Sequence, residues 1–77
     1  MLQIANYLQN LLDTTGISQR ELARAINTRP NTISDYASNK ITKYDMTLVA
    51  RICQYFGISI RDFLYDYIVT DDNIQKI

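Results

Sequence analysis

The sequence predicts a small all-α domain built from five helices. Its 77 residues can bury one small hydrophobic core and leave no room for a second domain. Hydrophobic residues make up 47% of the chain and charged residues 21%, with two glycines and one proline, which is the composition of a folded domain. Apolar residues recur at helical spacings between capping residues, and we find no alternation typical of strands. We therefore expect one domain over residues 1–69 and a polar tail over residues 70–77.

The first two predicted helices have clear start and stop signals. One apolar stripe marks the first helix, at Ile4, Leu8, Leu11 and Leu12. Gly16 then ends it. The second helix begins at Ser18, because Ser18 and Glu21 have the spacing of a capping box, in which each side chain satisfies a backbone N–H of the other residue. Its inward residues are Leu22, Ala23 and Ile26.

A tight turn at Asn27 and Thr28 separates the second helix from the third. Asn27 can adopt the left-handed conformation that glycine often supplies at such turns. Thr28 or Arg29 caps the third helix, and Pro30 occupies a first-turn position where its missing N–H costs nothing. The predicted buried face of this helix is Ile33, Tyr36 and Ala37.

Two further helices are expected in the second half of the chain. Asp45 caps the fourth helix and Gly57 ends it. Its apolar stripe is Leu48, Val49, Ile52 and Phe56. Ser59 and Asp62 repeat the capping pattern, so we expect a fifth helix after Ser59. Its apolar residues are Ile60, Phe63, Leu64 and Tyr67.

The charge is distributed unevenly although the net charge is zero. Residues 17–43 contain five basic and two acidic side chains, a net charge of +3, whereas residues 58–77 contain two basic and four acidic ones, a net charge of −2. A basic middle suits a domain with one face towards DNA. The zero total charge leaves open a protein-interaction module, because DNA-binding domains normally carry a basic excess.

Several function classes lack the residues they need. Cys53 is the only cysteine and there is no histidine, so neither an intramolecular disulfide nor a Cys/His zinc site can form within one chain. We find no nucleophile with a base beside it and therefore expect no enzyme activity, metal, cofactor or small-molecule ligand. The chain shows no signal peptide and no membrane-spanning run, and we expect a cytoplasmic protein.

The second and third helices have the layout of a helix-turn-helix, in which the second helix of the pair enters the major groove of DNA. The outward residues of that helix are Arg29, Asn31, Thr32, Ser34 and Asp35. Arginine can pair with guanine, asparagine with adenine, and aspartate can accept from cytosine. A polar face of this kind also occurs on a helix that is simply solvated.

The sequence resembles the Cro and phage-repressor helix-turn-helix family, also called the xenobiotic-response-element type. The segments that carry the resemblance are residues 17–23 (ISQRELA), 31–36 (NTISDY), Lys40, 51–53 (RIC), 56–59 (FGIS) and 62–64 (DFL). The resemblance as a whole spans roughly residues 8–67 and implies a five-helix domain like that of lambda repressor, without an effector domain. The closest likeness is to short phage, plasmid or restriction-modification controller proteins.

The resemblance also implies roles for individual residues. The predicted DNA-binding set is Gln19, Thr28, Arg29, Asn31, Thr32, Ser34, Asp35, Lys40 and Lys43. In the family, the position of Gln19 touches a phosphate, the outward positions of the third helix read bases, and the loop with Lys40 and Lys43 meets the DNA backbone. Some of these side chains also suit a role without DNA: Gln19 is a good exposed helix former, the lysines aid solubility, and Asp35 can pair with Arg29 or oppose non-specific phosphate contact.

One departure from the family supports this alignment. Many relatives carry an arginine at the position of Leu12 and a glutamate at that of Ala37, which form a partly buried ion pair. Replacing both members by apolar residues is often neutral or stabilising, whereas replacing one would leave a buried charge unpaired. We therefore expect Leu12 and Ala37 to meet between the first and third helices.

Together these observations predict a sequence-specific regulator of transcription that binds double-stranded DNA, most simply a repressor in a prokaryotic or phage-infected cell. One such module offers few base contacts, so we expect a homodimer on an inverted-repeat operator. The predicted dimer surface is the fifth helix around Tyr65, Tyr67 and Ile68, with Val69 beside it. The alternative is an antitoxin or anti-repressor that keeps the fold and binds another protein.

Overall fold

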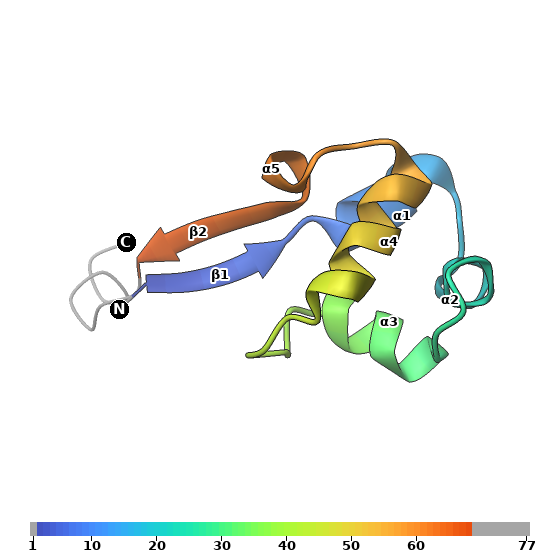
Figure 1. Ribbon diagram of the computed structural model, residues 1–77, viewed down its shortest axis with the longest axis horizontal. Helices are drawn as coiled ribbons and strands as arrows, with labels where there is room; N and C mark the ends of the chain where they lie inside the picture. The colour runs from blue at the N-terminus through green and yellow to red at the C-terminus, as the bar shows by residue number, and fades with distance from the viewer. Residues whose placement is uncertain (1, 69–77) are drawn as a thin grey trace.

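A computed structural model describes residues 2–68 of the chain and contains five helices and a two-stranded ribbon (Figure 1). In chain order the elements are β1 (Leu2–Asn6), α1 (Leu8–Thr15), α2 (Gln19–Ala25), α3 (Pro30–Ala37), α4 (Met46–Phe56), α5 (Ile60–Phe63) and β2 (Leu64–Ile68). The helices form the body of the molecule. The predicted polar tail, residues 70–77, and Val69 lie outside the described residues.

The ribbon corrects the expectation of an all-α domain. β1 and β2 pair antiparallel from Leu2 opposite Ile68 to Asn6 opposite Leu64. Ile4, predicted on the first helix, therefore lies in a strand. α5 is one turn long, and the chain becomes extended at Leu64, so Tyr67 belongs to β2 as well. Isoleucine and tyrosine favour strands, and here pairing between the two ends of the chain prevails over the helical spacing of the apolar residues.

The hydrophobic core lies between the helices, as the apolar stripes predicted. The largest fully buried side chains are Phe63, Leu8, Leu22, Ile33, Ile52 and Val49. Leu12 and Ala37 are both buried in this core, and α1 contacts α3. The two positions thus share one apolar environment, as the alignment requires. Of the apolar residues predicted for the fifth helix, Phe63 is buried, whereas Ile60 is 47% exposed.

Most of the predicted helix ends are confirmed. Ser18 and Glu21 form the capping box, with N–H···O distances of 3.0 and 3.1 Å. Asp45 accepts from the N–H groups of Thr47 and Leu48 at the start of α4. The fifth helix departs from the prediction: the Ser59 hydroxyl donates to the Asp62 carboxylate and does not accept from its backbone.

A buried asparagine joins the ribbon to the helices. The Asn6 side chain is 3% exposed; its Nδ2 donates to the carbonyl of Tyr36 (3.0 Å) and to Tyr44 Oη (3.1 Å). Its Oδ1 accepts from the N–H of Leu8 (2.9 Å), at the first turn of α1. The Asn39 side chain in turn bonds both backbone groups of Asn6. The end of β1, the start of α1 and the end of α3 are therefore fixed to one another.

The ribbon projects from the helical body (Figure 1). The molecule measures 41 × 20 × 20 Å, and its radius of gyration is 13.6 Å. A compact domain of this length has a radius of gyration of about 11 Å. The excess length is consistent with the arm formed by β1 and β2.

Replacing Asn6 with alanine should destabilise the protein strongly. The variant leaves the buried carbonyl of Tyr36 and the buried N–H of Leu8 without this partner. Each unsatisfied buried group costs about 1–3 kcal/mol, so the free energy of unfolding should fall by at least about 2 kcal/mol. Urea unfolding measures the change. Gln9→Ala, which removes an exposed hydrogen bond to Asp13, serves as the control and should cost less than about 0.5 kcal/mol. Equal losses for the two variants would contradict the role of Asn6.

Stability should also fall at high pH because of Cys53. Burial raises the pKa of this thiol above its ordinary value of 9.0, and the negative charge of Asp62 raises it further. As the pH rises, the unfolded chain therefore loses the thiol proton before the folded protein does. The contribution of Cys53 to the free energy of unfolding is complete below the pKa of the unfolded chain and is lost as the pH rises through the higher pKa of the folded protein. Denaturant unfolding from about pH 7 to pH 10 should give a steeper loss for the native protein than for Cys53→Ala. Parallel profiles would show that the thiol makes no contribution.

Candidate nucleic-acid interface

The α2–turn–α3 unit is held in place by its backbone and its core. Asn27 takes the left-handed conformation with φ 59°, as predicted. The N–H of Thr28 bonds to the carbonyl of Ala23 (2.8 Å), which closes the turn. Arg29 is the N-cap of α3 and Pro30 its first residue. Arg51 of α4 also donates to the carbonyl of Ile26 (3.4 Å), so the end of α2 is tied to the body.

α3 has a buried face and a polar face. Ile33, Tyr36 and Ala37 are buried, as predicted. The exposed residues are Arg29, Asn31, Ser34 and Asp35, and Thr28 and Thr32 are half-buried. The base-reading residues predicted from the sequence thus lie together on one helix, with side chains that can donate and accept hydrogen bonds.

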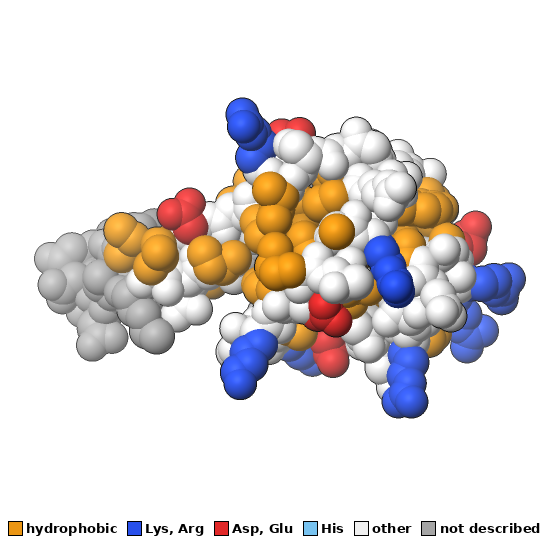
Figure 2. Space-filling model, viewed as in Figure 1, with side chains coloured by type: hydrophobic (Ala, Val, Ile, Leu, Met, Phe, Trp, Pro, Cys, Tyr) orange, Lys and Arg blue, Asp and Glu red, His pale blue; other side chains and the backbone are white. Residues whose placement is uncertain are grey.

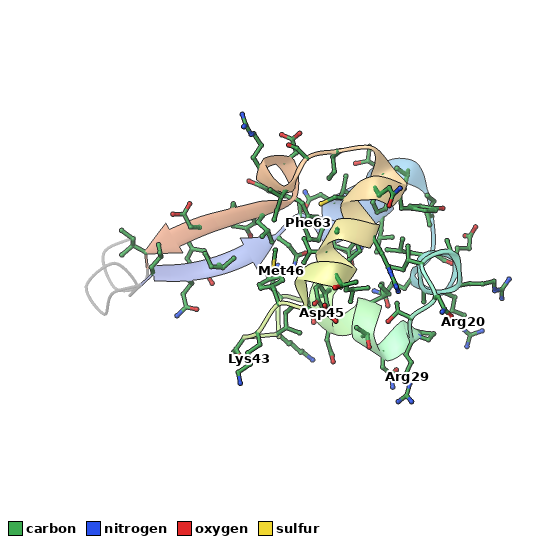
Figure 3. All side chains as sticks on the ribbon, in the orientation of Figure 1. Arg20, Arg29, Lys43, Asp45, Met46 and Phe63 are labelled. Atoms are coloured by element: carbon green, nitrogen blue, oxygen red, sulfur yellow. The ribbon has the colours of Figure 1, made fainter. Side chains whose placement is uncertain are left out.

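Basic side chains lie at both ends of this polar face. Figure 3 shows Arg29 at the start of α3 and Lys43 beyond its end, both pointing outward from the edge of the molecule on which α3 lies. Lys40 and Lys43 are exposed in the segment between α3 and α4. Asn39, in the turn that follows α3, has φ 57°, and the N–H of Lys40 bonds to the carbonyl of Asp35 (3.1 Å). The loop that carries the two lysines is therefore anchored to the helix.

Gln19 begins α2 and is half-buried. The same helix carries two further candidate DNA-binding residues, Arg20 and Arg24, which the sequence-based prediction did not include. Both are exposed, and they line a hollow of about 360 Å³ together with Thr28 and Pro30. The two arginines are four residues apart, a spacing that places side chains on one face of a helix. This spacing is the feature of the sequence from which the pair could have been predicted.

The residues predicted for dimerisation lie away from this edge. Tyr65, Tyr67 and Ile68 lie on β2 and are exposed, and not on a helix as expected. The rings of Tyr65 and Tyr7 lie against each other, with centroids 4.4 Å apart and ring planes tilted by 35°. The ribbon is thus a second surface, separate from the polar face of α3.

Other kinds of site find little support in residues 2–68. In this part of the chain no three His, Cys, Asp or Glu side chains lie close enough to hold a metal ion. Cys53 is buried, and burial raises the pKa of its thiol, which disfavours the reactive thiolate. None of the described helices is long and apolar enough to cross a membrane.

Comparison with known proteins places this arrangement in a family. A family model described as the Cro/C1-type helix-turn-helix DNA-binding domain matches residues 7–67. One solved structure, a candidate DNA-binding protein from Bacteroides fragilis, superimposes with a TM-score of 0.73 and 21% sequence identity, covering 82% of this chain and 100% of that one. A comparison with curated proteins gave no match. With a family match over most of its length, the chain belongs to the Cro/C1-type helix-turn-helix DNA-binding domains.

Proposed function

We propose that this protein is a sequence-specific transcriptional regulator that binds double-stranded DNA and represses a promoter by covering it. The observation that carries the proposal is the exposed face of α3, where polar side chains lie between Arg29 at one end and Lys43 beyond the other (Figure 3). This order suits a helix in the major groove, with base contacts at its centre and phosphate contacts on both flanks.

The side chains of the site divide into two groups. Arg29 and Asn31 lie at the first turn of α3, where base edges come closest, and Ser34 and Asp35 follow on the same exposed face. Gln19, Lys40 and Lys43 lie outside α3 and would meet only the sugar-phosphate backbone. Thr28 and Thr32, which are half-buried, would contact the DNA from the edge of this face.

Substitutions in the two groups should have different effects. Arg29→Ala or Asn31→Ala should cost on the order of 1–3 kcal/mol on the specific site and little on random duplex, because each removes a base contact. Lys40→Ala or Lys43→Ala should weaken binding to both duplexes alike. Each should also reduce the slope of log affinity against log salt concentration by about one unit. Binding isotherms on specific and scrambled duplexes at several salt concentrations measure both effects.

The specific duplex for these isotherms comes from selection out of a random pool. Gln9→Ala is the control, because Gln9 is exposed on α1 and lies outside the predicted set. If all four variants bind both duplexes as the native protein does, α3 is not the recognition helix. The alternative function, binding to another protein, would then be the better proposal, and the affinity for that protein would depend little on salt concentration.

The protein should bind as a homodimer to an inverted repeat. One module of this size makes too few base contacts for useful specificity, and two recognition helices on one face of the duplex require half-site centres roughly 34 Å apart. We expect the ribbon, which carries the exposed residues Tyr65, Tyr67 and Ile68, to supply the dimer contact; Tyr65 and Tyr67 lie on one of its faces and Ile68 on the other. Sedimentation on and off DNA, together with the symmetry of the selected sites, tests the claim. A monomer in both states or a site without two-fold symmetry would refute it.

A further inference from the structure

The β1–β2 ribbon exposes an apolar face. Side chains alternate across a strand, so Leu2 and Ile4 point to the same side as Asn6. The pairing register places Ile68 opposite Leu2 and Asp66 opposite Ile4, on that same side. Leu2, Ile4 and Ile68 are 59%, 47% and 64% exposed. A two-stranded ribbon is marginally stable alone, and packing of one face against a helix would stabilise it.

An apolar groove of about 380 Å³ lies on the surface of α4 and the chain that follows it. Its apolar lining residues are Met46, Val49, Ala50, Cys53, Ile58 and Ile60. Met46 and Ile60 are about half exposed, so the walls of the groove are open to solvent. A contiguous apolar surface of this kind on a small domain is typical of an interaction site.

The apolar face of the ribbon and the groove are found on one side of the molecule. Asn6, on that face of the ribbon, bonds to Tyr44, which lies two residues before Met46 at the start of the groove. Figure 2 shows hydrophobic side chains on both the ribbon and the body in this view. The ribbon extends away from the body, so its tip cannot reach the groove of its own chain (Figure 1).

We propose that a second copy of this chain occupies the groove: the ribbon of each protomer packs its apolar face on the α4 groove of the other. Such an exchange is isologous, since each copy supplies the same arm and the same groove about a two-fold axis. A five-residue strand is about 17 Å long, comparable to the 20 Å width of the body. Asp66 is the only charged residue of the paired strands, and Arg61 lies beside the groove residue Ile60, so one ion pair is available to the contact.

This arrangement leaves the DNA-binding edge free. α3 lies along one edge of the molecule, and Arg29 and Lys43 point outward from that edge and not across the face that carries the groove (Figures 1 and 3). A two-fold axis parallel to that face can therefore place both α3 helices on the same side of the dimer. This inference rests on the proposed function, because the exchange is the contact surface of the homodimer proposed there.

Disulfide trapping without DNA tests the exchange directly. In a Cys53→Ala background, the Ile4→Cys variant is mixed under mild oxidation with either the Ile60→Cys or the Tyr55→Cys variant. All three positions are exposed, but Tyr55 does not line the groove. The mixture with Ile60→Cys should give about tenfold more mixed disulfide than the control mixture, because the groove raises the effective concentration of the arm. A disulfide only between two Ile4→Cys chains would show ribbon-to-ribbon contact and overturn the proposal, as would equal yields in the two mixtures.

Sedimentation separates this inference from the proposed function. Ile4→Glu should weaken self-association about tenfold or more, and circular dichroism should show an unchanged fold because this side chain is half exposed. The variant should still bind a duplex with one half-site as the native protein does. A native protein that dimerises through the groove but binds no duplex would refute the proposed function alone. A native protein that binds duplex and stays monomeric would refute the ribbon exchange and the homodimer, and would leave the DNA-binding function standing.

Discussion

The hydrogen bonds of the buried Asn6 amide hold the parts of this small domain together. One side chain bonds to the start of α1, the carbonyl of Tyr36 in α3 and the hydroxyl of Tyr44. Each of these groups would lose its partner if the strand moved, and unpaired buried polar groups are costly. The ribbon, although it projects into solvent, is therefore rooted in the body at the point where β1 becomes α1.

The same set of contacts determines where the basic loop lies. Asn39 bonds both backbone groups of Asn6 from the end of α3, and Tyr36 Oη accepts from the N–H of Asp45, the cap of α4. The segment with Lys40 and Lys43 is thus fastened at both of its ends. A DNA-binding surface needs this rigidity, because bases are read only by side chains held in a defined register with the phosphate contacts.

Local features of the sequence were sufficient to predict the helical body and α3. Capping residues and apolar stripes act over three or four residues, which is why the ends at Ser18, Asp45 and Gly57 could be predicted. The ribbon depends on pairing between residues at opposite ends of the chain, such as Leu2 and Ile68, and no local pattern reports that. For the same reason, the helical spacing of Ile4 and Leu8 was misleading. The role of Asn6 could not be predicted either, because several of its hydrogen-bond partners come from distant segments of the chain.

The zero net charge does not oppose a nucleic-acid interface in a molecule of this shape. Exposed charges separated by more than a Debye length, about 8–10 Å at physiological salt, are largely screened from one another. The molecule is 41 Å long, and Asp66 lies on the ribbon that extends away from α3 (Figure 1). A phosphate group beside α3 would experience mainly the nearby charges, among which the cations, such as Arg20, Arg29 and Lys43, outnumber the acidic Glu21 and Asp35. The local surplus of basic residues, and not the sum over the chain, therefore decides which partner this surface attracts.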